Sequence, residues 1–145
     1  MQYYTEVAFL SNIYQKKTMS YANPQVNVLD LGQMIRLVGT DRPTLLELFT
    51  VFIRTTGDNM RQLRQEVAAG EWQKAGRLCH TIRGAATTMG AGRLAHALEL
   101  AEQRIKRGVA LASDFDPVFV EVDRVIEALN AEMANGLPTL RDFRL

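Results

Sequence analysis

The stretch EWQKAGRLCHTIRGAATTMG, residues 71 to 90, decides the fold because its apolar residues recur every three or four positions. Residues with that spacing lie on one face of an α-helix, and here they are Trp72, Ala75, Leu78, Cys79, Ile82, Ala86 and Met89. The glycines at positions 90 and 92 are typical of a helix end. The stretch therefore predicts one amphipathic helix whose apolar face packs into a core.

The same spacing continues on both sides of this stretch. It predicts further helices from Leu29 to Gly39, from Asp41 to Gly70, from Leu94 to Gly108 and from Asp116 to Asn135. Thr40 or Asp41 is suited to cap the second of these helices, and Asp116, which directly precedes a proline, is suited to cap the last. Gly57 is expected to weaken or bend the long second helix.

No convincing alternation of a β-strand is present, and the connections between the predicted helices are only a few residues long. Short connections make consecutive helices antiparallel neighbours. The predicted fold is all-α, an antiparallel up-and-down four-helix bundle with a short additional N-terminal helix, over residues 28–136. Residues 1–27 are expected to be a peripheral N-terminal extension, and residues 137–145 a short C-terminal tail.

The composition is that of a globular chain with one core, since 145 residues suit one domain and 47% of them are hydrophobic. A formal net charge of +1 gives no strong attraction to nucleic acid or to an anionic membrane. No apolar run reaches the roughly 18 residues that span a bilayer. The only cysteine, Cys79, excludes an internal disulfide. We expect a cytoplasmic, monomeric protein that binds neither nucleic acid nor membrane.

Four residues of the helix over 71–90 share the face beside its apolar stripe, namely His80, Arg83, Gly84 and Thr87. A neutral imidazole can act as a nucleophile, and a guanidinium suits phosphate oxygens. Glycine in a helix interior costs about 1 kcal/mol relative to alanine, and here it leaves one side of the ring uncrowded. This arrangement fits a phosphoryl-accepting histidine. It equally fits a surface histidine beside a glycine that serves packing, and the spacing leaves both interpretations open.

The residues from His80 to Gly90 resemble the signature of histidine-containing phosphotransfer (HPt) domains. In that signature a basic residue and a glycine stand three and four positions after the histidine, followed by small residues and a second glycine. The resemblance extends to the Leu-Asp start at 29–30, to Ala-Ala-Gly-Glu-Trp at 68–72 and to the Leu-Glu pair at 98–99. It covers roughly residues 28 to 134, and an eleven-residue motif in a helical bundle is a fairly specific signal.

The resemblance implies that His80 accepts a phosphoryl group at Nε2 from an aspartyl phosphate on a response-regulator receiver domain and passes it to another receiver. Receiver domains and a hybrid sensor histidine kinase are the partners it implies, and Thr87 and Ala91 are expected at the partner surface. The receiver supplies Mg²⁺, so the chain needs no metal ligands, no cofactor and no ATP site of its own. Such a chain is a phosphotransfer intermediate without autonomous kinase activity.

Two positions depart from the family pattern. The usual lysine three residues after the histidine is Arg83, which keeps the charge but replaces a compact ammonium with a planar fork. Many relatives carry a glutamine 22 residues after the histidine, where this chain has Glu102. A carboxylate there is expected to hold the Nδ1–H of His80 and leave Nε2 as the nucleophile.

Other functions stay open at the level of the sequence. The chain could be a helical docking module that binds receivers or kinases and is never phosphorylated. The dimerisation helices of sensor kinases also expose a histidine, but an acidic residue usually follows theirs, whereas Thr81 follows His80. A chemotaxis-type kinase P1 domain is a close relative, and the chain is either free-standing or a fragment of a longer hybrid kinase.

Three further signals are interpreted as structural. Residues 90–95, GAGRLA, match the dinucleotide-binding fingerprint, but a helix precedes them where that motif needs a strand. Cys79 is expected in the core, because adjacent helical residues point about 100° apart. His96 has no clustered cysteine or acidic residues of metal-site spacing and is expected to be structural.

Overall fold

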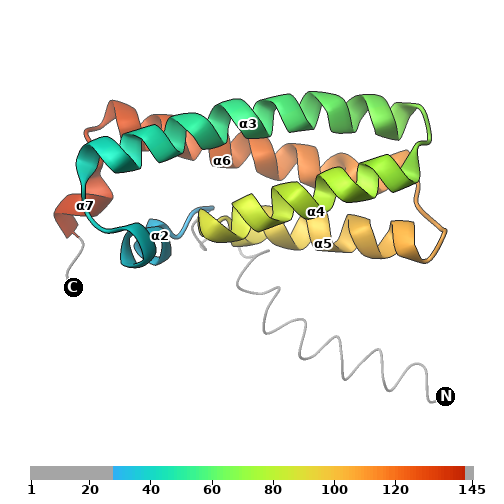
Figure 1. Cartoon of the computed structure of the whole chain (residues 1–145), viewed down its shortest axis with the longest axis horizontal. Helices are drawn as coiled ribbons and strands as arrows, with labels where there is room; N and C mark the ends of the chain where they lie inside the picture. The colour runs from blue at the N-terminus through green and yellow to red at the C-terminus, as the bar shows by residue number, and fades with distance from the viewer. Residues whose placement is uncertain (1–27, 143–145) are drawn as a thin grey trace, which may run out of the picture.

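The computed structural model describes residues 28–142, and four long helices make up most of that range (Figure 1). They are α3 (Arg42–Ala68), α4 (Trp72–Thr88), α5 (Gly92–Lys106) and α6 (Asp116–Ala134). Three short elements accompany them: α2 (Leu31–Val38), a 3₁₀ turn η1 (Ala112–Phe115) and α7 (Pro138–Asp142). Residues 1–27, where the peripheral extension was predicted, and residues 143–145 lie outside the described residues.

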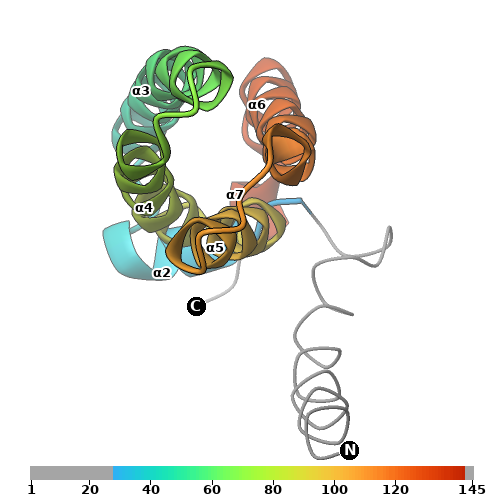
Figure 2. The same ribbon diagram turned by 90° about the vertical axis from the view of Figure 1, so that its right-hand side faces the viewer.

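The long helices form a ring around a common core, as the view along the bundle shows (Figure 2). Each packs on the next in the chain, and α6 returns to α3. Three-residue connections at 69–71 and 89–91 reverse the direction of the chain, so consecutive helices run antiparallel. No strand occurs within residues 28–142. The predicted all-α antiparallel bundle with a short additional helix is therefore confirmed.

The apolar stripes predicted from the sequence form the core. The fully buried large side chains come from every long helix and include Phe49, Leu63, Ile82, Leu94, Leu98, Val125 and Leu129. Among the described residues, the buried side chains that carry polar groups are Thr56 and Glu102. Burying a carboxylate is costly unless other charges or hydrogen bonds compensate it, so the position of Glu102 needs an explanation in the site.

The short helix α2 is fixed to the bundle at the turn between α4 and α5. The backbone N–H of Asp30 donates to the carbonyl of Gly90 at 2.8 Å, and Met34 and Ile35 are buried. Gly90 has a φ of +71°, and a Cβ at this position would overlap the carbonyl group of Asp30. Gly90 thus serves both the left-handed turn and the close approach of α2.

The opposite end of the bundle is closed by η1, which the sequence pattern did not predict. Phe115 at the end of this turn is fully buried and stacks on Trp72 at the start of α4, with ring centroids 5.9 Å apart. The turn leads directly into α6, so Phe115 occupies the N-cap position and Asp116 is already helical. The prediction that Asp116 caps this helix is wrong, whereas Asp41 caps α3 as predicted by accepting from the Thr44 N–H.

The long helix α3 runs unbroken through Gly57 over its 27 residues. A Cβ at Gly57 would meet only the end of the Arg61 side chain, at 3.9 Å. The helix therefore passes this glycine without a break, and its buried side chains on both sides of it belong to one core.

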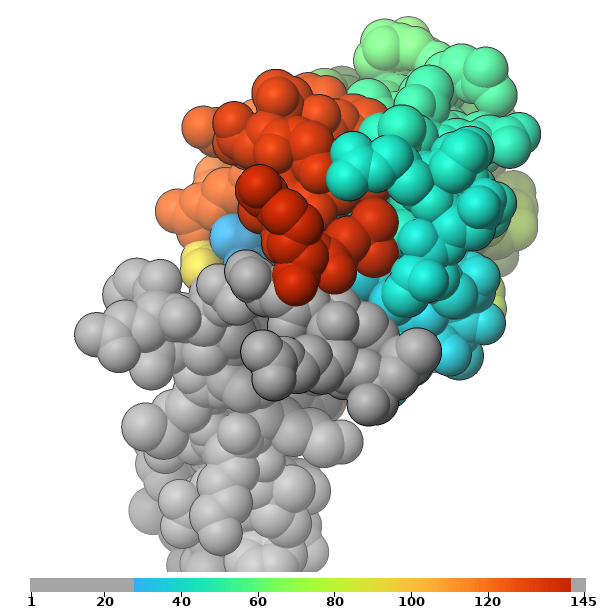
Figure 3. Space-filling view, turned by 90° about the vertical axis from the view of Figure 1, so that its left-hand side faces the viewer, coloured from blue at the N-terminus to red at the C-terminus, as the bar shows by residue number. Residues whose placement is uncertain are grey.

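The stretch predicted as a tail contributes to the core. Leu137 is 2% exposed, and the following residues form α7, which lies against the start of α3 at one end of the molecule (Figure 3). Leu137 adopts a φ of +58°. That conformation costs about 1–2 kcal/mol for a residue with a side chain. Burying a leucine gains about 1.5–3 kcal/mol, so the packing offsets the strain.

The contact between Gly90 and Asp30 predicts unequal effects of two similar substitutions. Gly70 has nearly the same φ, +70°, but a Cβ there would meet nothing within 4 Å. Gly70→Ala is expected to lower the free energy of unfolding by about 1 kcal/mol through backbone strain alone. Gly90→Ala is expected to cost at least about 2 kcal/mol more, because α2 must also move. Urea denaturation of both variants measures this, and equal losses would contradict it.

Candidate functional site

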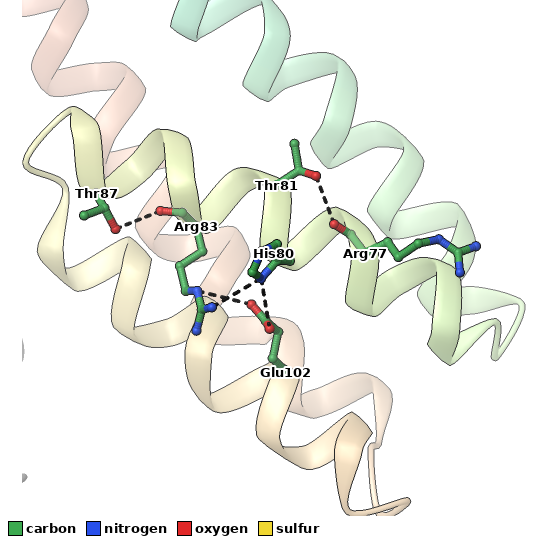
Figure 4. A network of polar contacts seen from close by, with 6 residues as sticks. All are labelled: Arg77, His80, Thr81, Arg83, Thr87 and Glu102. Atoms are coloured by element: carbon green, nitrogen blue, oxygen red, sulfur yellow. Dashed lines mark hydrogen bonds and ion pairs between the residues drawn. The ribbon is translucent and has the colours of Figure 1, made fainter.

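His80 lies on the outer face of α4, with 72% of its side chain exposed (Figure 4). Its neighbours Cys79 and Ile82 are buried and hold that turn of α4 against the core. The exposure follows from helix geometry, because residues one position apart point about 100° apart. The imidazole is therefore accessible to another protein while its backbone is firmly positioned.

Gly84, one turn after His80, has no packing role inside the described part of the chain. A Cβ built at this position would meet nothing within 4 Å. Since glycine costs about 1 kcal/mol here relative to alanine and no internal contact requires it, the packing interpretation left open by the sequence fails. Gly84 leaves open surface on the face of α4 that also carries His80.

Glu102 lies beneath His80 on α5, and its side chain is only 6% exposed. Its Oε2 is 3.7 Å from Nδ1 of His80, the nitrogen whose proton it was expected to hold. This distance is longer than a hydrogen bond, so the contact in the free chain is an electrostatic one. Oε1 is buried and has no hydrogen-bond partner.

Arg83 connects the two groups (Figure 4). Its Nη2 lies 3.3 Å from Nδ1 of His80, and its Nε lies 3.4 Å from Oε1 of Glu102. The Arg83 side chain is 32% exposed, so the guanidinium can reach both the buried carboxylate and the solvent. Arg83 thereby supplies the positive charge that the buried Glu102 needs. A role of Arg83 toward phosphate was predicted from the sequence, but its contacts with both neighbours were not.

The two residues expected at the partner surface have different positions. Thr87 is exposed, and its hydroxyl donates to the backbone carbonyl of Arg83 at 2.9 Å. Ala91 is fully buried in the turn before α5, where its N–H donates to the carbonyl of Ala86 at 2.8 Å. A side chain without exposed surface cannot contact a partner, so the prediction for Ala91 is wrong.

An apolar groove of about 290 Å³, which the sequence pattern did not predict, runs between α2, α3 and α4 on one side of His80. Its lining is mostly apolar or small and includes Met34, Val38, Leu48, Val51, Phe52, Thr81, Ala85 and Thr88. Val38 and Val51 are at least 40% exposed, which is unusual for side chains next to a core. In the sequence the available signal was Val51, an apolar residue outside the predicted core stripe of its helix.

A second groove, of about 570 Å³, flanks His80 on the side of α5. Its lining includes His80 and Glu102 themselves, together with two basic side chains, Arg77 and Lys106. Thr81 borders both grooves. His80 therefore lies between an apolar groove and a basic one, and both are open to a docking protein.

Other chemistry-bearing residues have structural surroundings. Burial, reinforced by the nearby Glu102 carboxylate, raises the pKa of the Cys79 thiol to about 12, so it stays protonated and unreactive. Partial burial lowers the pKa of His96, against the opposing effect of Glu99. Within residues 28–142 no group of three metal-ligating side chains comes together, and no helix there is long and apolar enough to cross a membrane.

The comparisons with known proteins agree with this geometry. The family model described as Hpt domain matches residues 47–135, which is more than half of the chain and includes α4, α5 and α6. Searches of curated proteins and of solved structures gave no match. The matched segment contains His80, Arg83, Gly84 and Glu102. The chain belongs to the Hpt domain family, the histidine phosphotransfer modules of two-component signalling.

Proposed function

We propose that His80 accepts a phosphoryl group from an aspartyl phosphate on one response-regulator receiver domain and passes it to another. The observation that carries this proposal is an exposed imidazole with open space over Gly84 and a guanidinium at its side. The first phosphoryl donor in such a relay is the receiver of a hybrid sensor histidine kinase. A cytoplasmic, monomeric chain suits the role.

The chemistry requires little from this chain. The lone pair on Nε2 of His80 attacks phosphorus, the bond from phosphorus to the aspartyl oxygen breaks, and the aspartate leaves as a carboxylate. The Arg83 fork is suited to the phosphoryl oxygens, and the Glu102 carboxylate near Nδ1 favours the positive charge that the ring gains. Mg²⁺ on the receiver neutralises the transferring group, so this chain needs no cofactor of its own.

The two grooves suggest how a receiver docks. The apolar groove beside α4 offers a surface that gains free energy when it is covered, and Thr81, Ala85 and Thr88 on its α4 side are small enough for close approach. The basic groove complements the acidic residues with which a receiver holds its Mg²⁺. A receiver that covers both grooves brings its aspartyl phosphate to the exposed His80 between them.

Replacement of the acceptor tests the proposal directly. When the chain is incubated with a receiver phosphorylated on its aspartate, wild type is expected to acquire an acid-labile, base-stable phosphoryl mark. His80→Gln is expected to acquire none, while His96→Gln is marked like wild type. If wild type binds the receiver but remains unmarked with every cognate receiver, the chain is instead a docking module.

The open space over Gly84 predicts a separation of folding from transfer. Gly84→Gln is expected to keep the fold and to gain about 1 kcal/mol of helix stability, because a Cβ there meets nothing within 4 Å. The same side chain projects into the space of the incoming phosphoryl group, so transfer is expected to fall at least about tenfold. Gly57→Gln on α3 is the matched control, and it should transfer normally. Unchanged transfer in Gly84→Gln would contradict the clearance role.

The buried carboxylate predicts a graded series at Glu102. Glu102→Gln keeps an oxygen acceptor near Nδ1 and should transfer within a few-fold of wild type. Glu102→Ala removes the acceptor and leaves Arg83 without its buried partner, so the phosphotransfer rate is expected to fall about tenfold or more. Rapid-quench measurement of the phosphohistidine formed gives both rates. Wild-type kinetics in the alanine variant would exclude Glu102 from the site.

A further inference from the structure

The contacts of Nδ1 determine which nitrogen of His80 is available for reaction. In a neutral imidazole one nitrogen carries the proton and the other carries the lone pair. Nδ1 faces two groups of opposite kind: Arg83 Nη2 at 3.3 Å and Glu102 Oε2 at 3.7 Å. A guanidinium can only donate, and a carboxylate can only accept. The two contacts therefore favour opposite tautomers of His80.

In the free chain the contact with Arg83 is the better hydrogen bond. Its distance and angle meet those of a hydrogen bond, whereas the Glu102 contact does not. A donor at Nδ1 requires the lone pair there, which puts the proton on Nε2. Nε2 is the nitrogen that attacks phosphorus in the proposed transfer, and with a proton it is not a nucleophile. The arrangement of Arg83 thus holds His80 in its unreactive tautomer.

We propose that Arg83 is a positioning residue that controls the tautomer of His80 and releases it when a phosphoryl group arrives. This inference rests on the proposed function. A phosphoryl anion attracts the guanidinium more strongly than a neutral imidazole nitrogen does. When the fork turns to the phosphoryl oxygens, Nδ1 loses its donor and can be protonated, and the Nδ1–H then donates a hydrogen bond to the nearby carboxylate of Glu102.

The proton balance needs only water. The exposed ring loses the Nε2 proton to solvent and gains one from solvent at Nδ1, so the imidazole stays neutral and the lone pair moves to Nε2. That lone pair attacks phosphorus as described above. The arrangement makes His80 reactive only when an anion is in place beside it.

The tautomer can be measured without any receiver. Nitrogen-15 NMR of histidine-labelled protein distinguishes the Nδ1–H form from the Nε2–H form, and His80→Gln identifies the signals of this ring. The measurement is made at a pH at which the ring's own titration shows it to be neutral. Wild type is expected to be mainly in the Nε2–H form.

Arg83→Met removes the donor while keeping much of the side-chain length, and the ratio of Nδ1–H to Nε2–H should rise about threefold or more. Arg83→Met combined with Glu102→Gln should show a smaller rise, because an amide accepts less strongly than a carboxylate. Arg77→Met is the matched control. It removes the same charge one turn before His80, and Arg77 points its guanidinium away from the ring (Figure 4).

The proposal is overturned if Arg83→Met and Arg77→Met give the same tautomer ratio, or if wild type is already mainly in the Nδ1–H form. Circular dichroism of each variant establishes that the bundle is intact. Because no phosphoryl donor is present, failure here leaves the relay function untouched. Conversely, the tautomer ratio is measured in the free chain, so it can be determined even if transfer to His80 fails.

Discussion

The packing of α4 on α5 is the interaction on which the site depends, because it places the buried carboxylate of Glu102 beneath the exposed imidazole of His80. A carboxylate that is 6% exposed is stable only with compensation, and Arg83 provides it from α4. The two helices are therefore joined at this level by charge as well as by apolar contact. The same pair of charges surrounds the one nitrogen of His80 that faces the protein.

This packing is set by the short turn between the two helices. Gly90 allows the left-handed conformation there and also lets Asp30 approach, so the turn fixes the register of α4 and α5 and the position of α2 together. The placement of α2 in turn forms one wall of the apolar groove beside His80. A residue ten positions away from the histidine thus shapes the surface that a receiver is proposed to cover.

The sequence was sufficient for the elements whose physical causes are local. Helical spacing predicted the four long helices, and the exposure of His80 followed from its place beside the apolar stripe. Ala91 was misjudged because its burial depends on how the turn folds under α4, which spacing does not report. Leu137 and Phe115 were missed for a related reason: each is buried through a short irregular segment whose conformation tertiary packing decides. The apolar groove arises only when three helices meet.

The two departures from the family pattern are explained best as a pair. A glutamine beneath the histidine is neutral and needs no nearby cation, so a lysine in the next turn is free for the phosphoryl group. Glu102 introduces a buried charge, and a fork with several nitrogens can contact that charge and Nδ1 at once, as Arg83 does at 3.4 and 3.3 Å. A lysine offers a single nitrogen, which is less suited to contact both the Glu102 carboxylate and Nδ1 of His80. The arginine therefore compensates the carboxylate and, in the proposed relay, is also available to an arriving phosphate.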